Sequence, residues 1–386
     1  MFRLFTDMHN RTVIIGTIEK GIRSAYDETI SVTGKKCGET SMKRIIAAIL
    51  IVMAILIGLP ALTELSAPKQ PDHDPLPVKV LILPKFEVDQ MYGDFPGEAQ
   101  YYYEQYLMNA DEYDIPNSGG NRLFYKDEVA LYLLGEGKVS AAMNTMAVLS
   151  DDRFDFSDAY IISTGCAGSA VDTTVMGDVF VITSCVDFDL GHHADAREIA
   201  DPDGTTWFRD SDFDSSAFVT MDPQLCEKVF SLVKDTPLST TEKTRNYMSA
   251  AFENADWAVR DPKVMRGTSL TADNFWKGIH DHANALLAVE TYGCPDPYTA
   301  SEMEDTAIGR AVNRMGMLDR LIVIRDSVNM DVFMFGDTPE TLWADAEGTT
   351  IANEENVEAA DIFATAMKNN FDVGRIIIDL ILSGKF

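Results

Sequence analysis

An uncharged run of 18 residues, Ile45–Leu62, divides the chain into a short leader and a long remainder. Lys43 and Arg44 stand directly before the run, and a small residue, Ala67, lies shortly after it. A basic flank, an apolar core and a small residue are typical of a secretory signal, with Ala67 as the expected cleavage point. Because 18 residues also approach the length that spans a bilayer, an uncleaved signal anchor is the alternative. The secretory signal and the signal anchor both predict an exported protein, whether periplasmic, cell-surface or extracellular. The signal anchor also predicts a membrane tether through residues 45–62.

Four segments follow from this division. Residues 1–41 form a leader that is unusually long for a signal, which leaves open that Met42 is the true start. Residues 42–67 form the signal peptide or signal anchor. Residues 68–77 are a Pro-rich polar linker, and residues 78–386 are expected to form one folded domain.

The chain beyond the signal is strongly acidic. The whole sequence holds 32 Lys+Arg and 61 Asp+Glu, a formal charge of −29. Residues 1–67 contain 8 of the basic and 6 of the acidic residues, so 24 basic and 55 acidic residues remain and the rest carries −31. Such a surplus repels phosphate backbones and anionic headgroups, which excludes nucleic acid polymers as partners and favours neutral or cationic ones.

Apolar β-rich runs alternate with helical stretches from Val78 onward. The expected strands are Val78–Leu83, Val129–Leu134, Ala159–Ile162, Asp178–Ser184, Leu286–Val289 and Arg320–Arg325. The expected helices are Lys138–Leu149, Asp222–Val233, Ala300–Met315 and Glu358–Ile381. This order predicts an α/β domain, a three-layer α/β/α sandwich with a central mixed sheet.

Two glycine turns follow strands, at Gly135-Glu136-Gly137 and at Gly165-Cys166. Turns of this kind bring backbone N–H groups close to a ligand at the ends of strands, where α/β folds bind. An ordinary tight turn is the alternative for each.

The cysteines and histidines indicate no metal site. Four cysteines follow the signal, at Cys166, Cys185, Cys226 and Cys294. That number permits two disulfides without requiring any. The pairs His192-His193 and His280/His282 have no third ligand at a matching spacing, so we expect neither a metal nor a cofactor.

Several short sequence blocks between Lys79 and Phe333 follow one another in the same order as the motifs of a known protein family. They are Gly135–Lys138, Phe154–Ser157, Thr164–Gly168, Asp195–Ile199, Asn274–Gly278, Tyr298–Asp305 and the segment around Arg325. Gly135–Lys138 and Thr164–Gly168 resemble the nucleoside phosphorylase and methylthioadenosine nucleosidase superfamily. The other five blocks resemble, more narrowly, the purine nucleoside permease family, a branch with this fold. The resemblance implies a nucleoside phosphorylase-like domain, a purine nucleoside as ligand and a homo-oligomer.

The resemblance also implies a ligand-binding site. Met303 and Glu304 match the superfamily's ribose-binding Met-Glu, with Glu304 accepting hydroxyl groups and Met303 packing on the sugar. The alternative for Glu304 is a solvated helix start. Gly165 and Cys166 are expected near the ligand, as is Arg325.

An aromatic residue completes the expected binding site. Phe275 lies in the block that looks like the superfamily's base-pocket segment, where its ring could stack on a purine. Core packing is the alternative for Phe275, since aromatic residues after a strand are commonly buried.

Candidate catalytic groups follow from the chemistry of the N-glycosidic bond. Its cleavage puts positive charge on the ribose and negative charge on the base, so it needs carboxylates near the sugar and a donor near base N7. Asn329 stands where hydrolytic relatives carry an acid, and an amide donates a hydrogen bond but delivers no proton. Asp326 or Asp331 could supply the proton that Asn329 cannot deliver. The alternative for Asp331 is a turn residue after a strand. Glu87 resembles a first-strand Glu used near the attacking water, with an exposed loop acid as its alternative.

Phosphate is a weaker expectation. Ser163 occupies the position where phosphorylases of the superfamily often place an anion-binding Arg, so phosphate capture needs Arg325, Arg197 or Lys85 to converge on the site. A solute carrier needs many membrane spans and this sequence has one candidate, so a permease acting alone is excluded. Three functions remain: an exported nucleoside-binding protein that serves uptake, an exported nucleosidase or phosphorylase, and a non-catalytic module on the same fold.

Overall fold

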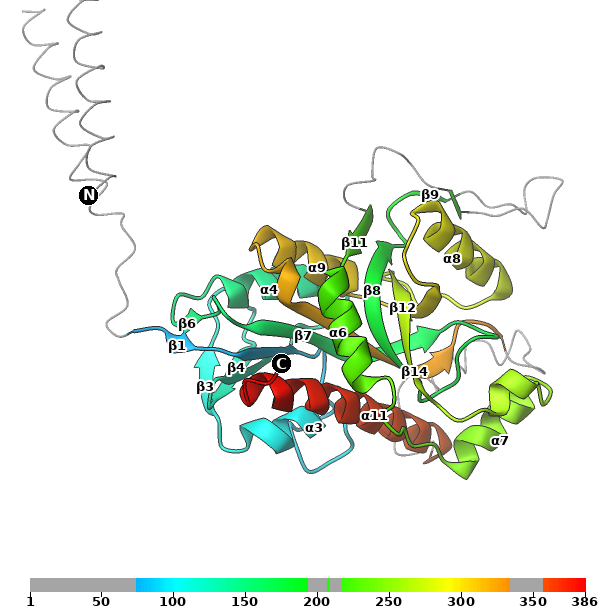
Figure 1. Cartoon of the computed structure of the whole chain (residues 1–386), viewed down its shortest axis with the longest axis horizontal. Helices are drawn as coiled ribbons and strands as arrows, with labels where there is room; N and C mark the ends of the chain where they lie inside the picture. Colours follow the sequence, from blue (N-terminus) through cyan, green and yellow to red (C-terminus); the bar gives the residue numbers. More distant parts are fainter. Residues whose placement is uncertain (1–73, 194–206, 209–216, 334–356) are drawn as a thin grey trace, which may run out of the picture. The chain divides into compact units, whose positions relative to one another are not determined.

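The computed structural model describes residues 74–193, 207–208, 217–333 and 357–386 (Figure 1). All of them belong to one compact unit, Pro71–Phe386. Outside the described residues lie the leader, Met42, Ile45–Leu62, Ala67 and Asp195–Ile199. Within the described ranges, no helix is both long and apolar enough to cross a bilayer.

A mixed sheet of ten strands runs through the unit. Its strands are β2 (Val80–Leu83), β3 (Asp111–Asp114), β4 (Arg122–Lys126), β5 (Val129–Tyr132), β7 (Tyr160–Ser169), β8 (Val179–Asp187), β11 (Phe218–Thr220), β12 (Val264–Thr271), β13 (Tyr298–Glu302) and β14 (Leu321–Met330). Their order is β11-β8-β12-β13-β7-β2-β5-β4-β3, and β14 pairs with both β7 and β8. Two short ladders join β1 (Leu76–Pro77) to β6 (Phe154–Asp155) and β9 (His192–His193) to β10 (Trp207–Phe208).

The central strands send side chains into two hydrophobic cores, because successive residues of a strand point to opposite faces. In β2, Leu81 and Leu83 pack into one core, and Val80 and Ile82 pack into the other. Both faces of this strand are therefore buried. This burial explains why its sequence is apolar throughout rather than alternating.

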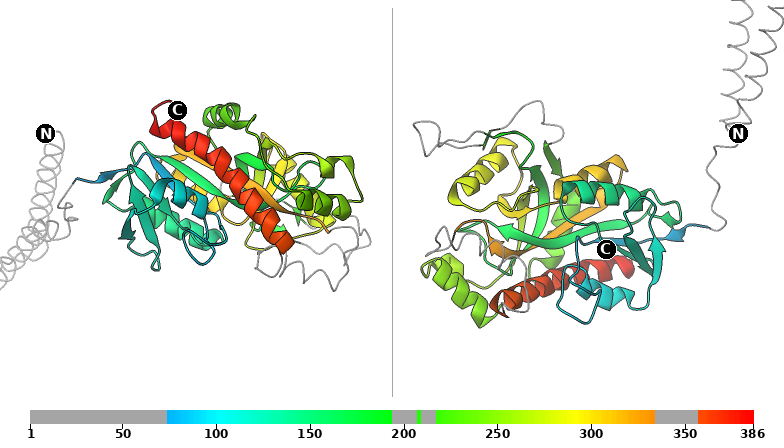
Figure 2. Two further views of the ribbon diagram at one scale, coloured as in Figure 1. Left: turned by 90° about the horizontal axis from the view of Figure 1, so that it is seen from below. Right: turned by 180° about the vertical axis from the view of Figure 1, so that it is seen from behind.

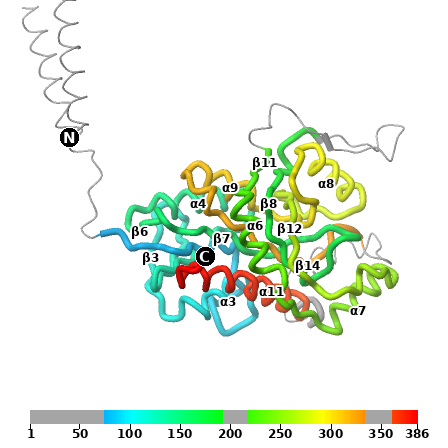
Figure 3. The backbone as a smooth tube through the Cα atoms, in the orientation of Figure 1, coloured from blue at the N-terminus to red at the C-terminus, as the bar shows by residue number. Residues whose placement is uncertain are grey.

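Helices cover both faces of the sheet. They are α3 (Gln100–Tyr102), α4 (Lys138–Leu149), α6 (Pro223–Val233), α7 (Glu242–Ala251), α8 (Ile279–Thr291), α9 (Asp305–Arg314) and α11 (Val357–Leu382). Helices α4 and α9 pack into the first core, and α6 and α11 into the second (Figure 1, Figure 2). Helix α11 also lies against α3 and β2, so the two ends of the domain meet (Figure 3). The predicted three-layer α/β/α arrangement with a central mixed sheet is confirmed.

Local capping rules explain where two helices begin. The carboxylate of Asp222 accepts a hydrogen bond from the amide of Leu225 at 2.7 Å, and Pro223 occupies the first position of α6. The hydroxyl of Thr241 accepts from the amide of Thr244 at 3.1 Å before α7. Each cap satisfies an amide that lacks a partner within its helix.

Two predicted elements are wrong. Leu286–Val289, expected as a strand, lies inside α8, whose residues Ala285, Ala288 and Val289 are buried. An apolar run of four residues does not distinguish a strand from the buried face of a helix. The predicted helix Ala300–Met315 begins as strand β13 and becomes helical only at Asp305. Strand β12 was not predicted, because polar residues interrupt its apolar pattern.

The thiols of Cys166, Cys185, Cys226 and Cys294 are free. Burial raises the pKa of Cys185 well above its usual value, and raises that of Cys226 to about 11. These two side chains therefore act as small apolar groups within the first core.

Candidate functional site

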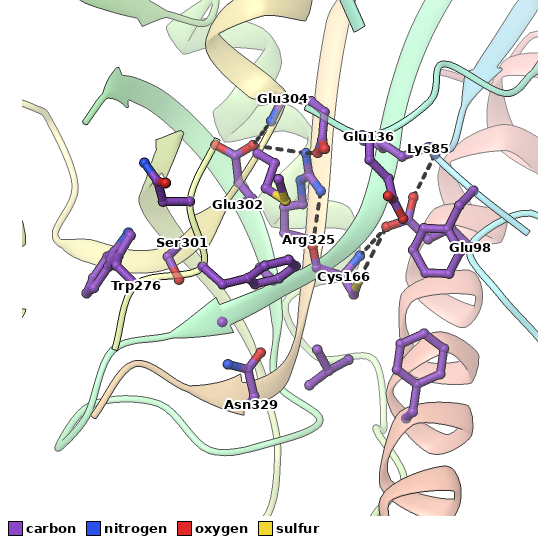
Figure 4. A pocket seen from close by; sticks show the side chains of 18 of the residues that line it. Lys85, Glu98, Glu136, Cys166, Trp276, Ser301, Glu302, Glu304, Arg325 and Asn329 are labelled. Atoms are coloured by element: carbon purple, nitrogen blue, oxygen red, sulfur yellow. Dashed lines mark hydrogen bonds and ion pairs between the residues drawn. The ribbon is translucent and has the colours of Figure 1, made fainter. Parts of the chain in front are cut away.

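A cavity of about 460 Å³ opens beside β7, β13 and β14 (Figure 4). One group of lining side chains is charged and buried: Lys85, Glu98, Glu302, Glu304 and Arg325. A second group is apolar: Phe86, Val88, Phe95, Val328 and Phe363. The loop Asn274–Lys277 also lines the cavity, as do Met303 and Asn329. The volume and the mixed lining are typical of small-molecule sites.

Arg325 lies at the centre of the charged group and is 1% exposed. Its Nη2 atom is 3.1 Å from a carboxylate oxygen of Glu302 and 3.1 Å from one of Glu304 (Figure 4), and it is 2.7 Å from one of Asp305. Three carboxylates thus share one guanidinium. Burial, and then repulsion from Asp305, raises the pKa of Glu302 to about 7, and burial also raises the pKa of Glu304.

Glu302 and Glu304 differ in what their oxygens already accept. Glu302 accepts the amides of Glu304 and Asp305 at 2.6 and 2.7 Å and the hydroxyl of Thr271 at 2.5 Å, which fixes the start of α9. Glu304 accepts the amide of Gly137 at 2.9 Å on one oxygen and Arg325 on the other. A carboxylate has about four acceptor positions, so Glu304 keeps capacity for ligand hydroxyl groups.

Lys85 is a second buried cation, 2% exposed. Its ammonium donates to the hydroxyl of Ser163 at 2.9 Å and to the carbonyls of Thr164 and Leu83 at 2.8 and 3.4 Å. Burial lowers the pKa of Lys85, as does repulsion from Arg325. An ammonium has three protons, and here each has an acceptor inside the protein.

Glu98 joins the end of β2 to β7. One of its oxygens accepts the amide of Lys85 at 2.7 Å, and the other accepts the amide and thiol of Cys166 at 2.9 and 3.4 Å. A Cβ atom on Gly165 would lie 2.3 Å from this carboxylate, so glycine is needed there for close approach. Glu98 was missed in the sequence, where it follows a Pro-Gly turn without any pattern that marks it.

Glu87 lines the pocket and also holds the loop that follows it. Its carboxylate accepts the amides of Val88 at 2.8 Å and Ala99 at 3.0 Å, and the amide of Gly97. Burial raises the pKa of Glu87 to about 7, against the lowering effect of these backbone donors. A group that titrates near neutral pH suits general acid–base chemistry.

The aromatic residues of the wall are not equivalent. Phe275 is 77% exposed, so it does not belong to the core. Trp276 packs against Phe188 with ring centroids 5.2 Å apart. Phe363 of α11 contacts Phe86 and Phe95, with centroids 6.4 and 5.9 Å apart.

Asp331 lies outside the pocket lining and is 1% exposed. Its carboxylate accepts the hydroxyl of Tyr298 at 2.9 Å and the amide of Val171 at 3.3 Å, and lies 2.7 Å from Nδ1 of His282. Asp331 is therefore more than a simple turn residue, because three groups from other segments of the chain contact its carboxylate. In the described part of the chain, no group of three or more His, Cys, Asp and Glu side chains is placed to hold a metal.

The structure thus brings together seven of the nine predicted site residues. The seven that line the pocket are Glu87, Cys166, Phe275, Met303, Glu304, Arg325 and Asn329. Gly165 lies just behind the wall, and Asp331 is held in a separate cluster. The roles of these residues remain predictions.

Comparison with known proteins identifies a family whose sequence model this chain matches. A model of the family described as purine nucleoside permease (NUP) matches residues 77–385. The chain is 26% identical over 221 residues to a Schizosaccharomyces pombe protein named "Probable purine nucleoside permease", a region covering 51% of this chain and 63% of that protein. The chain therefore spans less than two thirds of that relative.

Solved structures are more distant. A 5′-methylthioadenosine/S-adenosylhomocysteine nucleosidase from Neisseria meningitidis matches with 16% identity and a TM-score of 0.47, over 78% of this chain and 98% of that one. A futalosine hydrolase from Helicobacter pylori matches with 14% identity and a TM-score of 0.48, over 78% and 97%. Likeness at this level says nothing of what this chain binds or catalyses.

Proposed function

Because the chain belongs to the purine nucleoside permease family, we propose that its folded domain binds a purine nucleoside in the pocket beside β7, β13 and β14. The observation that carries the proposal is the buried carboxylate of Glu304, oriented by Gly137 and Arg325 and still able to accept two hydroxyl donors. Asn329 can donate to a purine nitrogen, and Phe275 offers an aromatic face.

The charges of the pocket favour an uncharged ligand. Five glutamates line it, Glu87, Glu98, Glu136, Glu302 and Glu304, against the three cations Lys85, Lys277 and Arg325. Both buried cations already donate to acceptors in the protein. A phosphate group would therefore meet several carboxyl groups without a strong free donor from Lys85, so nucleosides should bind better than nucleotides.

The biological role proposed for this binding is nucleoside uptake by an exported protein. The family name and the signal-like run Ile45–Leu62 support this role. N-terminal sequencing and cell fractionation test it. A mature protein beginning after Ala67, or an uncleaved protein in the membrane fraction, is expected, and a soluble cytoplasmic product with an intact N-terminus would contradict export.

Hydrolysis of the nucleoside is the second candidate. Glu87 has a pKa near 7 and lines the pocket, so it could take a proton from an attacking water. Phosphorolysis is disfavoured by the saturated ammonium of Lys85. Asn329 delivers no proton to the departing base, which argues for slow chemistry or for binding alone.

One experiment separates these functions. The full chain is incubated with inosine, adenosine or guanosine, with and without phosphate, and free base and ribose are followed by chromatography while binding is measured by calorimetry. We expect saturable binding of intact nucleoside, and base release without phosphate would identify a nucleosidase. Release only with phosphate would contradict the argument from Lys85, and absence of binding would refute the proposed function and leave a non-catalytic module.

The role of Glu304 has its own test. Glu304→Gln should weaken inosine binding by about 10- to 100-fold, since hydrogen bonds to a charged group contribute about 1.5–3 kcal/mol. Because the ribose hydroxyls are its partners, 2′-deoxyinosine should bind the wild type more weakly and be less affected by the substitution. Glu136→Gln is the matched control, with the same change in charge on an exposed residue of the same pocket. Equal losses in both variants would contradict a specific contact.

A further inference from the structure

Lys138, the first residue of α4, lies at a junction of three chain segments outside the charged group of the pocket. Its ammonium is 2.7 Å from a carboxylate oxygen of Asp187, 2.9 Å from one of Asp189 and 3.9 Å from one of Asp273. Asp187 ends β8, Asp189 follows it by two residues, and Asp273 follows β12. The side chain of Lys138 is 17% exposed, so these contacts are partly shielded from solvent.

The same carboxylates hold the loop that forms one wall of the pocket. Asp189 accepts the amide of Asp273 at 2.6 Å and the side-chain amide of Asn274 at 3.2 Å. Asp273 in turn accepts the backbone amide of Lys138 at 2.8 Å. The next residues along the chain, Phe275 and Trp276, line the pocket.

The backbone at Lys138 also reaches the other side of the site. The preceding residue, Gly137, donates its amide to Glu304 at 2.9 Å. The start of α4 is therefore tied both to the carboxylate proposed to bind ribose and to the loop that carries Phe275. A shift of the α4 start would move these two parts of the pocket relative to each other.

Charge makes the ammonium of Lys138 essential to this arrangement. Its favourable contacts with Asp187 and Asp189 raise the pKa of Lys138 despite the opposing effect of burial. Without the ammonium, the three carboxylates would repel one another across a few ångströms. Since Asp189 and Asp273 are the groups that hold the loop, their separation would release it.

We propose that Lys138 is a positioning residue that fixes the loop Asn274–Lys277 against Glu304 and thereby sets the affinity of the pocket for its ligand. The inference rests on the proposed nucleoside binding. It concerns a residue that does not itself line the cavity.

The test uses full-length Lys138→Met, which keeps a similar apolar stem without the charge, and Lys138→Arg, which restores the charge. We expect Lys138→Met to weaken inosine binding by about 10- to 100-fold, the scale of losing one hydrogen bond to the charged Glu304, with much of the loss recovered in Lys138→Arg. The urea midpoint of unfolding should change far less than the affinity. Lys79→Met is the matched control, because Lys79 pairs with Glu128 near the surface, where their side chains are 47% and 38% exposed.

A second readout needs no ligand. In Lys138→Met, hydrogen exchange should quicken at the amides of Asp273 and Gly137, and the tryptophan emission, to which Trp276 contributes as one of four tryptophans, should shift. Failure of the wild-type protein to bind any nucleoside would count against the proposed function, while exchange in the ligand-free protein still decides whether Lys138 holds the loop. Unchanged exchange and affinity in Lys138→Met would overturn the proposal.

A milder variant covers the case in which Lys138→Met does not fold. Asp189→Asn keeps the shape of a side chain that is 27% exposed and removes one carboxylate charge from the junction. It should quicken exchange at Asp273 and weaken inosine binding while the protein stays folded. If the amide of Asp273 exchanged at the same rate in this variant as in the wild type, the proposal would also be overturned.

Discussion

Arg325→Met should destabilise the domain by about 4 kcal/mol near neutral pH. The guanidinium is 1% exposed, and the three carboxylate side chains that it contacts are 5% exposed or less. Removing one partner from a buried ion pair typically costs about 3–5 kcal/mol, because the other charge stays buried without compensation. This loss is a large share of the roughly 5–15 kcal/mol by which such domains are stable.

The destabilisation should grow as the pH rises. The pKa of Glu302 is raised from 4.5 to about 7 even with Arg325 present, and loss of the guanidinium should raise it further. A carboxyl group with a raised pKa in the folded state contributes stability below its unfolded pKa, and this contribution is lost as the pH rises through the folded pKa. The deficit at pH 8 should therefore exceed that at pH 5 by up to about 1.4 kcal/mol through Glu302, because the wild-type carboxyl already ionises at about pH 7 and one pKa unit corresponds to about 1.4 kcal/mol.

Urea unfolding followed by circular dichroism at pH 5 and pH 8 measures both quantities. Arg122→Met is the control, because Arg122 and its partners Glu112 and Asp114 are largely exposed. Its unfolding midpoint should stay close to that of the wild type at both pH values. The reasoning would be refuted if Arg325→Met unfolded at the same urea concentration as the wild type. It would also be refuted if the loss of stability in this variant were larger at pH 5 than at pH 8.

Three further substitutions test separate parts of the site. If the protein releases base, the rate should rise as the pH passes about 7, and Glu87→Gln should be slow at every pH; an unchanged profile in the variant would exclude Glu87 as the base. Gly165→Ala should lower the stability by about 1–3 kcal/mol, because its Cβ would collide with Glu98, and an unchanged melting temperature would contradict that contact. Asp331→Asn should lower the melting temperature through its buried contact with His282 but leave inosine affinity within about twofold; a selective loss of affinity would instead restore Asp331 as a site residue.

The layers of the fold could be predicted from the sequence because they depend on hydrophobic burial. Continuous apolar runs such as Val80–Leu83 and the segment before Ser163 are typical of strands covered on both faces. Helix α4 has the predicted bounds, since a glycine turn precedes Lys138 and an uninterrupted helical pattern follows it. The predicted strand Leu286–Val289 was wrong because four apolar residues fit a helix face as well as a strand.

The site could be predicted only in part. Residues within recognisable blocks, such as Met303 and Glu304, line the pocket as expected. Glu98 depends on contacts with residues 13 and 68 positions away and follows a turn with no distinctive pattern, so local sequence rules do not reveal it. Lys85 was named only as one of three cations that could converge on the site, and its contacts with Ser163 and Thr164, 78 and 79 positions away, come from the fold. Asp331 lies apart from the pocket lining for a related reason: its partners Tyr298 and His282 come from distant segments that only the fold brings together.

The two buried cations decide what the pocket can accept. In a chain whose residues 68–386 carry a formal charge of −31, Arg325 and Lys85 are surrounded by acceptors of the protein itself. Their charge is therefore used to hold Glu302, Glu304 and the neighbouring backbone in place rather than offered to a ligand. What remains open toward the cavity is mainly acceptor capacity, of which Glu304 is the clearest example. Such a site recognises a molecule that brings its own donors, and a sugar with vicinal hydroxyl groups meets that requirement where a phosphate does not.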